Sequence, residues 1–551
     1  MSLKLHKNYK TALLIFCAGM VLFTSSCKKD DVLEPVDPTD TAVTLGEGTR
    51  AELTKDSIFL YAKEIYLWND ALPDYESFKP RGFNTYDNDL DNYNAELFAI
   101  SQLKINPATG QPYEFYAQNP DVPKYSGITD ITTINSAQAF VNKEKADVEL
   151  DGTGFDLGIH WFIPYGTDAN FSFYITGVYP NSPAAKAGLT RGAIINKVNG
   201  ATIGTNYNAQ YLLVYNIVED DPTSVTISGV KSDGTPFTDV VLTKAKYTSS
   251  PVFSTKTLTA GTKKIGYLAL AQFSNLENNA KKDLDAAFTK FVADGVSDLI
   301  IDLRYNGGGF VNTAEYLINL IAPATASGTM FKEHYNKTLQ EADSTILVNQ
   351  PLLDDNDKVQ YHPDGTMVTY DDIDFSVEAN TVAFSKKGNL STVANVVFLV
   401  SENTASASEL VINSLKPYVN VKLVGKQTYG KPVGFFPIRL ENKYDVYMSL
   451  FESKNSRDEG GYYAGFTPDV VDKGTTALYD DATHDFGDAS ESYTKAALGL
   501  LAPVTTSTSS QKVMSIRGKQ VSVATAIGLL KDAKDIKQFV GMIETRHKLR
   551  K

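Results

Sequence analysis

The 551-residue sequence has few of the side chains on which metal, cofactor and disulfide chemistry depend. It contains 2 cysteines and 6 histidines; no two histidines lie four residues apart, and there is no His-Glu-x-x-His sequence. Gly430-Lys431 is followed by proline, so the glycine-rich loop that cradles phosphates is missing too. We therefore expect no metal and no cofactor.

A basic surface is also missing. The chain carries 52 Lys and Arg against 65 Asp and Glu, a formal net charge of −13. This balance argues against a nucleic-acid partner and against an electrostatic grip on anionic lipid. Apolar residues make up 42% of the chain, enough for large cores, and its length predicts three or four domains.

The only long apolar run lies close to the first residue. Lysines at positions 4, 7 and 10 precede the apolar stretch 12–23, which is too short to span a bilayer stably. A basic segment followed by a short apolar segment is typical of a signal peptide, which we place at residues 1–26.

Thr24-Ser25-Ser26-Cys27 resembles a bacterial lipobox, although leucine is more usual at the position of Thr24. The competing Cys17 follows the bulky Phe16. We expect lipid on Cys27, no structural disulfide, and a membrane anchor made of lipid rather than of charge. The following Lys28-Lys29-Asp30-Asp31 is similar to the acidic export tag of Bacteroidetes surface lipoproteins; a solvated linker that happens to carry charge is the alternative. The expected location is the cell envelope, at the outer membrane and surface-exposed if the tag acts.

The strongest chemical signal is a serine followed 25 residues later by a lysine. Ser406 lies between the apolar run 394–400, which predicts a buried strand, and residues 409–415, which predict a helix. A serine becomes a nucleophile when a nearby base takes its proton. Lys431 can be that base if burial lowers its pKa from about 10.4 by about 3 units.

A second pattern lies a hundred residues earlier. The apolar positions between 284 and 292 have helical spacing, Gly295 ends the helix, and residues 299–304 predict a strand. Gly307-Gly308-Gly309 then follows. Glycines after a buried strand let the backbone approach a substrate and point N–H groups at it, as an oxyanion hole requires.

Together these motifs resemble those of the C-terminal-processing (tail-specific) serine peptidases. The family pattern Asp-Leu-Arg-x-Asn-x-Gly-Gly is matched at 302–309, and its Ser-Ala-Ser-Glu followed by Gly-Lys is matched at 406–409 and 430–431. The resemblance implies Ser406 as nucleophile, Lys431 as general base, and the N–H groups of Gly308 and Ala407 as the oxyanion hole.

One position departs from the family. Many members carry a glutamine four residues after the lysine to orient it, and this chain has Phe435 there. Glu409 and Asp302 are candidates for support, no better than structural. Ser408 lies two residues too late to be the nucleophile, and His484 beside Asp485 is read as a surface histidine rather than part of a triad.

Residues 148–247 resemble a PDZ domain of the kind found in bacterial proteases. The sequence Ser182-Pro183-Ala184-Ala185 before Gly188-Leu189 and the later Val198-Asn199-Gly200 carry the likeness, while the usual Gly-Asp is Gly192-Ala193 here. Such domains add an extended peptide as a strand and hold its terminal carboxylate with loop N–H groups. The resemblance implies that this loop comprises Gly154, Phe155, Asp156 and Leu157.

These readings predict an α/β multidomain protein with a helical N-terminal domain, a β-rich PDZ domain and an α/β (crotonase-like, ClpP-related) serine protease core. The predicted sections are a signal peptide (1–26), a tether (27–50), the helical domain (51–147), the PDZ domain (148–247), the core (248–503) and a tail (504–551) with a basic, helix-like end. Residues 325–390 form a polar insertion that carries no motif.

The expected function is an envelope serine endopeptidase that receives polypeptides by their free C-terminus. The alternative from another class is a non-catalytic PDZ lipoprotein that binds peptides through a degenerate protease domain. The missing glutamine favours that alternative, and the two intact motifs oppose it. The sequence gives no oligomeric state.

Overall fold

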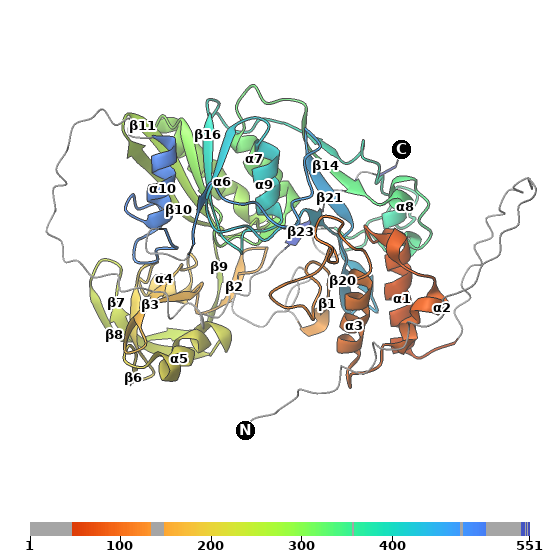
Figure 1. The fold of residues 1–551 in the computed structure, drawn as a ribbon, viewed down its shortest axis with the longest axis horizontal. Helices are drawn as coiled ribbons and strands as arrows, with labels where there is room; N and C mark the ends of the chain where they lie inside the picture. Colours follow the sequence, from red (N-terminus) through yellow and green to blue (C-terminus); the bar gives the residue numbers. More distant parts are fainter. Residues whose placement is uncertain are drawn as a thin grey trace, which may run out of the picture. The chain divides into compact units, whose positions relative to one another are not determined.

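The computed structural model describes residues 47–133, 148–354, 358–473, 478–502, 541–545, 547, 549 and 550 (Figure 1). The described residues from Gly48 onward belong to one compact unit. The predicted signal peptide, Cys27 and most of the tether lie outside the described residues, so these hypotheses and the proposed domain boundaries remain predictions.

A mostly parallel sheet forms the centre of the protease core. Its strand order is β10-β11-β12-β16-β17-β22, and every neighbouring pair after the antiparallel β10–β11 pair is parallel. The sequence predicted the buried strands here because they are continuous apolar runs. The bounds are β10 (Val252–Ala260), β11 (Lys263–Leu270), β12 (Asp298–Asp302), β16 (Asn395–Val400), β17 (Asn420–Gly425) and β22 (Val470–Val471).

Helices cover both faces of this sheet (Figure 1). Successive strand residues point to opposite faces, so Val397 and Leu399 of β16 belong to one core cluster and Val396 and Phe398 to another. The first cluster includes residues of α10 (Ser492–Leu501); the second includes residues of α6 (Lys281–Ala293), α7 (Val311–Ile321) and α9 (Ala407–Leu415).

This topology brings the two sequence motifs to one edge. The glycine-rich turn follows the carboxyl end of β12, and Ser406 follows that of the adjacent, parallel β16. Ligands of open α/β sheets bind outside the carboxyl ends of the strands. The topology therefore places Gly308 and Ser406 where a site is expected.

The PDZ region has its own sheet and core. The strand order is β3-β4-β5-β7-β8, with β6 paired to β5. A separate apolar cluster lies between this sheet and α5 (Tyr207–Glu219), with Phe173, Tyr215 and Ile227 at its centre. The bounds are β3 (Phe162–Thr167), β4 (Asn170–Ile175), α4 (Pro183–Lys186), β5 (Ile194–Val198), β6 (Ala201–Thr202), β7 (Ser224–Val230) and β8 (Pro236–Thr243). The two-stranded pair β2 (Thr153–Asp156) and β9 (Ala245–Thr248) flanks this sheet in the sequence.

The N-terminal helices share a core with the protease region. Helix α1 begins at Arg50, where Thr49 and Glu52 form a capping box, and it buries Ile58, Ala62 and Ile65. The chain then forms β1, which pairs with β20 of the protease region. The bounds are α1 (Arg50–Ile65), α2 (Tyr75–Phe78), α3 (Asp89–Ser101), β1 (Gly127–Asp130), β19 (Ile438–Leu440) and β20 (Tyr444–Tyr447).

The insertion 325–390 contributes to a further sheet of order β15-β14-β21-β18. The insertion contains β14 (Thr329–Tyr335), α8 (Lys337–Gln340) and β15 (Thr381–Ala383). The other two strands of the sheet are β18 (Val433–Gly434) and β21 (Phe451–Asn455). Near the end of the chain, β23 (Gly541–Ile543) pairs in parallel with β13 (Gly308–Phe310). The prediction of a helix-like end is therefore wrong for 541–543: the apolar Met542 and Ile543 are buried in a β pairing, and this tertiary contact overrides local pattern.

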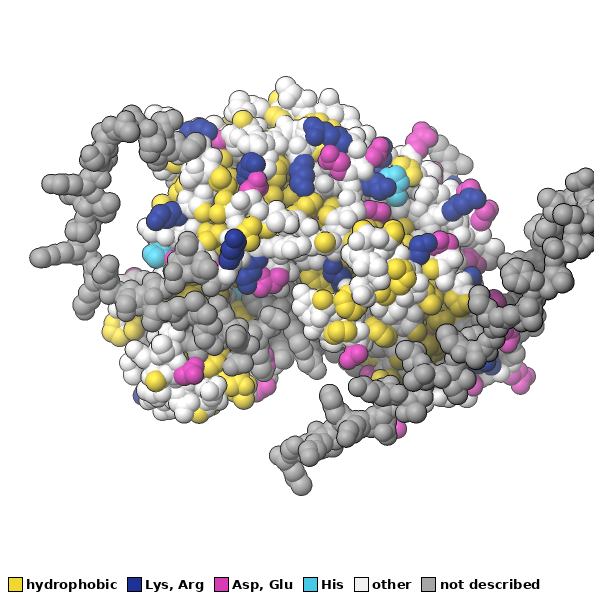
Figure 2. Space-filling view, viewed as in Figure 1, with side chains coloured by type: hydrophobic (Ala, Val, Ile, Leu, Met, Phe, Trp, Pro, Cys, Tyr) yellow, Lys and Arg dark blue, Asp and Glu magenta, His cyan; other side chains and the backbone are white. Residues whose placement is uncertain are grey.

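Among the described residues, no helix has the length and apolar character needed to cross a bilayer. On the face drawn in Figure 2, lysine and arginine side chains alternate with carboxylates. Acidic and basic side chains are therefore interspersed on this face.

Candidate active site

Ser406 sits at the start of a helix on an unusual backbone. It is the N-cap of α9, with φ 58° and ψ −111°, and its side chain is 0% exposed. A non-glycine residue with positive φ costs of order 1–3 kcal/mol and persists only where the surroundings enforce it. The positive end of the α9 dipole also lies here, which favours negative charge near Ser406.

The buried Glu409 carboxylate ties Ser406 to Lys431. Glu409 Oε2 accepts hydrogen bonds from the backbone N–H of Ser406 (3.0 Å) and of Lys431 (2.7 Å). Its Oε1 accepts from Thr428 Oγ1 (2.5 Å) and from the Gly430 N–H (2.8 Å). Burial raises the pKa of Glu409, and the hydrogen bonds oppose that rise. One carboxylate thus fixes the backbones of both predicted dyad members.

Lys431 has the buried surroundings that a neutral lysine needs. Its side chain is 1% exposed, and burial lowers its pKa from 10.5 to about 7. The negative charges of Glu114 and Glu409 act in the opposite direction, while the positive charge of Lys124 adds to the lowering. A large fraction of Lys431 is therefore deprotonated near neutral pH, the state in which it can accept a proton.

The groups around the Lys431 amine come from distant parts of the chain. Its Nζ lies 3.5 Å from the carbonyl oxygen of Tyr125 and 4.2 Å from the ring centre of Phe435. The Tyr125 hydroxyl donates to the carbonyl of Gly430, the residue before the lysine. An aromatic face and a backbone carbonyl thus lie beside the amine where many family members have a glutamine side chain.

Ser406 and Lys431 are not hydrogen-bonded to each other in this conformation. Among the described residues, Ser406 Oγ is buried and has no hydrogen-bond partner. Catalytic hydrogen bonds are often long without substrate and tighten only when substrate is bound.

Gly308 lies beside Ser406, but its N–H is already engaged. Gly308 has φ 114°, and a Cβ placed on it would lie 3.1 Å from the Ser406 Cβ, so only glycine fits here. Its N–H donates to Asn306 Oδ1 at 2.9 Å. Ala407, the other expected donor, is the first residue of α9, where backbone N–H groups have no partner within the helix.

A buried ion network supports the strand that leads to Gly308. Arg304 donates to Asp302 at the end of β12, to Glu491 and to Asp480. Arg191 of the PDZ region donates to Asp480 at 2.8 Å and to the Tyr305 hydroxyl at 2.7 Å. Asp302 therefore anchors Arg304 instead of facing the dyad, and this network connects the two regions.

Two alternative candidates have other partners. Ser408 Oγ donates to the carbonyl of Asn306 at 3.0 Å, a structural contact. His484 Nδ1 lies 2.7 Å from Asp481 Oδ2, and Asp485 pairs with Lys256. The His484 side chain is 39% exposed, in keeping with a surface histidine.

The expected PDZ loop is partly a strand. Gly154, Phe155 and Asp156 belong to β2 and pair with β9, and Phe155 is 56% exposed. Asp156 Oδ1 accepts hydrogen bonds from the Gly158 N–H and the Tyr247 hydroxyl. Leu157 is buried, and its carbonyl accepts from the N–H of Ala184 at the start of α4. The peptide-binding role of these residues stays a prediction.

Sequence reasoning missed Tyr125 and underrated Glu409. Tyr125 lies in a stretch rich in tyrosine, asparagine and aspartate, with weak periodicity, and no local pattern points to a residue 306 positions away. Glu409 did carry a signal: a glutamate three residues after a serine at a helix start predicts hydrogen bonds to backbone N–H groups. In the described residues, no cluster of histidine, cysteine and carboxylate side chains could hold a metal ion.

Two family models match the chain. Residues 264–471 match Peptidase family S41, and residues 174–213 match the PDZ domain. The first match includes Gly308, Ser406 and Lys431. The chain thus contains one region that matches the S41 serine peptidases and another that matches PDZ domains.

Curated relatives agree with this assignment. The "Probable CtpA-like serine protease" of Staphylococcus aureus (strain N315) is 24% identical over 337 residues, which cover 60% of this chain and 56% of the relative. "Carboxyl-terminal-processing peptidase 1, chloroplastic" of Arabidopsis thaliana is 25% identical over 342 residues, 61% of this chain and 58% of the relative. The chain thus spans less than two thirds of the length of these relatives.

A solved structure shares the fold. The "Putative S41 protease" from Bacteroides fragilis NCTC 9343 is similar with a TM-score of 0.53 and 20% identity, covering 81% of this chain and 96% of that one. The α/β multidomain fold class, with a PDZ domain and a protease core, is confirmed.

Proposed function

We propose that the protein is a serine endopeptidase in which Ser406 attacks the peptide carbonyl and Lys431 is the general base. One observation carries this proposal: the same buried carboxylate, Glu409, holds the backbone N–H groups of Ser406 and Lys431. The lowered pKa of Lys431, about 7, supplies a base near neutral pH.

The reaction follows from these groups. Neutral Lys431 takes the Ser406 hydroxyl proton as Oγ bonds to the carbonyl carbon, and the N–H groups of Gly308 and Ala407 stabilise the resulting oxyanion. For this step the Gly308 N–H must turn from Asn306 Oδ1 to the substrate oxygen. Lys431 then passes its proton to the leaving amine, and water hydrolyses the acyl-enzyme in a second round.

The test uses an unstructured polypeptide and two serine variants of α9. Ser406→Ala should abolish cleavage. Ser414→Ala is the matched control, because Ser414 is also buried in α9 and its hydroxyl has no partner among the described residues. Cleavage by Ser406→Ala at the wild-type rate would refute the dyad; inactivity of every form, wild type included, would favour the non-catalytic peptide-binding alternative.

We further propose that the PDZ domain recruits the polypeptide by its free C-terminal carboxylate. The match of residues 174–213 to the PDZ model supports this proposal. Amidating the C-terminus of a substrate should raise its KM more than it lowers kcat, and equal kinetics for acid and amide would rule out carboxylate capture.

The location is likewise a proposal: lipid on Cys27 anchors the protein to the outer membrane, with surface exposure directed by residues 28–31. The motif at Thr24–Cys27 supports it. Cys27→Ser should release the protein from membranes, and intact-mass analysis should find lipid on residue 27 of the wild type. An unmodified cysteine would contradict this proposal.

A further inference from the structure

A segment far from the catalytic motifs in sequence lies between them in space. Strand β23 (Gly541–Ile543) runs parallel to β13, with Gly541 opposite Gly308, and the Gly541 N–H donates to the carbonyl of Gly307 at 3.1 Å. The element that carries the expected oxyanion donor thus pairs with a piece of the same chain more than two hundred residues away.

The other edge of the segment pairs with the element that follows Lys431. The Phe435 N–H donates to the carbonyl of Met542 at 3.1 Å, and the Glu544 N–H donates to the carbonyl of Phe435 at 3.2 Å. Main-chain hydrogen bonds with alternate side chains in pockets are how proteins bind an extended peptide. Here residues 541–544 make such bonds on both sides.

The segment also lies against the nucleophile. A Cβ on Gly308 would collide with the Gly541 carbonyl oxygen and would lie 3.1 Å from the Ser406 Cβ. The Gly541 carbonyl and the Ser406 side chain are therefore both neighbours of Gly308. Met542 is 0% exposed, as is Ser406, and Lys431 is 1% exposed. The catalytic groups are closed off from solvent in this conformation.

We propose that residues 541–544 are an internal ligand of the catalytic cleft, which occupies the track of the polypeptide substrate and slows cleavage by the resting protein. This inference rests on the proposed function and adds a regulatory ligand to it. The chemical class of this ligand is an extended peptide segment with large apolar side chains, here Met542 and Ile543.

The geometry also explains why this ligand inhibits and is not cleaved. Cleavage requires a carbonyl oxygen to accept from the Gly308 N–H. That N–H instead donates to Asn306 Oδ1. The segment therefore fills the track while the oxyanion hole stays unformed.

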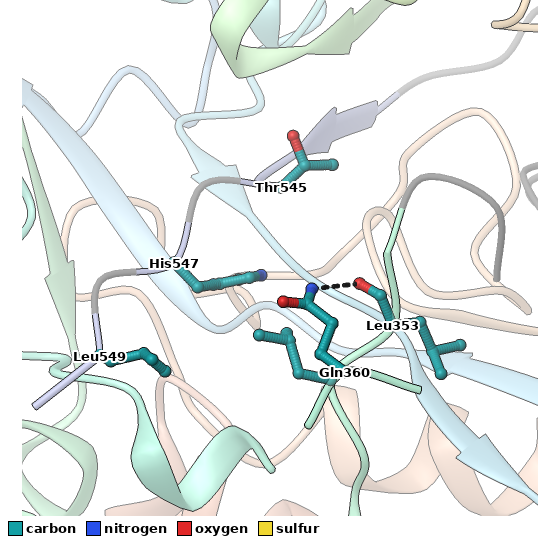
Figure 3. Close-up of a pocket in the computed structure, with 6 residues that line it drawn as sticks. Leu353, Gln360, Thr545, His547 and Leu549 are labelled. Atoms are coloured by element: carbon teal, nitrogen blue, oxygen red, sulfur yellow. Dashed lines mark hydrogen bonds between the residues drawn. The ribbon is translucent and has the colours of Figure 1, made fainter. Parts of the chain in front are cut away.

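Residues 547, 549 and 550 fasten the segment to the polar insertion. The His547 ring lies 5.2 Å from the Tyr370 ring, Leu549 forms a β-bridge with Ile373, and the Arg550 N–H donates to the carbonyl of Asp372 at 2.7 Å. Figure 3 shows a pocket between the insertion and the end of the chain, which is lined by Leu352, Leu353, Gln360, Thr545, His547 and Leu549. The insertion, which carries no motif, thereby gains a role as the dock of this segment.

The test compares two full-length methionine variants on an unstructured polypeptide. Met542→Asp places a charge in the buried position and should raise the initial rate at least fivefold. Met367→Asp is the matched control, because Met367 is 41% exposed on the insertion, and it should keep the wild-type rate. Leu549→Ala, which loosens only the dock, should give an intermediate rate and guards against a folding defect in Met542→Asp.

A peptide of residues 541–551 should restore inhibition when added to Met542→Asp, raising KM without lowering kcat. Wild-type rates for both Met542→Asp and Leu549→Ala, with no inhibition by the peptide, would overturn the proposal.

A peptide-binding measurement distinguishes the failure of this inference from the failure of the proposed function. A fluorescent 541–551 peptide should bind the double variant Ser406→Ala/Met542→Asp at least tenfold more tightly than Ser406→Ala, whose own segment competes. If this holds while no form cleaves polypeptide, the peptidase function fails and the internal ligand stands. If cleavage occurs but the peptide binds both variants equally or neither, only the internal ligand is refuted.

Discussion

Lys431 shows at the scale of one residue that burying a lysine lowers the stability of the folded protein. Its pKa is lowered from 10.5 to about 7 in the folded protein, chiefly by burial. Between pH 7 and pH 10 the unfolded chain therefore binds one more proton than the folded chain, and the free energy of unfolding rises with pH. Below pH 7 the full penalty of burying the charge applies.

We expect Lys431→Met to stabilise the protein most below pH 7. The lowering of the pKa from 10.5 to about 7 corresponds to roughly 5 kcal/mol as an upper bound, and this gain should shrink as pH approaches 10. Urea unfolding at pH 6 and pH 9.5 measures it. Lys337→Met, at an exposed lysine, controls for loss of a charge. A gain from Lys431→Met that is equal at both pH values would contradict the assigned cause.

Ser406 makes a second residue-scale prediction because of its positive φ. Ser406→Gly and Ser406→Ala both lose the hydroxyl and should both be inactive, but only glycine adopts this backbone without strain. Urea unfolding should therefore give Ser406→Gly a free energy of unfolding that exceeds that of Ser406→Ala by about 1 kcal/mol. Equal stability would show that α9 tolerates the side chain without strain.

The residue scale is also where the sequence was most informative. Ser406, Lys431 and Gly308 were predicted because each belongs to a short motif with fixed spacing, and the fold brings Gly308 and Ser406 together. The distant part of the Lys431 surroundings was not predictable, because Tyr125 contacts the lysine through tertiary packing alone.

At the scale of elements, the contact between α9 and the loop before Lys431 depends on Glu409. Both of its oxygens accept from backbone N–H groups, so an amide in its place would point its NH₂ group at a donor whichever way it turned. Glu409→Gln should therefore lower kcat at least tenfold with KM within twofold, and lower stability by about 2 kcal/mol.

Steady-state kinetics with urea unfolding test this positioning role. The matched control is Glu402→Gln, since Glu402 is about half exposed and pairs with Lys426. A Glu409→Gln variant that loses stability yet keeps its kcat would reduce Glu409 to a structural residue.

Strands and helices of the core were predictable because their apolar runs and helical spacings are long. Helix α6, strand β16 and helix α9 lie where the sequence placed them, within a few residues. Strand β23 was not, because three residues carry no usable period and their partner, Gly308–Phe310, is distant in the sequence.

At the scale of the whole molecule, Asp480 connects the PDZ region to the protease core. Burial alone would raise its pKa, but Arg191 and Arg304 hold it below its usual value. A carboxyl with a depressed pKa contributes stability above its unfolded pKa of about 3.9, and that stability is lost as pH falls below this value.

Asp480→Asn should therefore destabilise the protein at pH 7 by about 3 kcal/mol, because it leaves two buried arginines short of a partner, and the difference from wild type should narrow at pH 3. Urea unfolding at both pH values measures it. Asp485→Asn is the control, since Asp485 is half exposed in its pair with Lys256. A constant difference would show that the Asp480 charge is not responsible.

The contact between Tyr125 and Lys431 has a consequence for the time at which activity arises. The two residues are 306 positions apart, so the lysine has these buried surroundings only after the segment that carries Tyr125 and β1 has packed on the region around Lys431. Until then its amine is in water and protonated. On the proposed function, a chain that is still being made or only partly folded would therefore lack the base needed for cleavage and would spare itself and its neighbours.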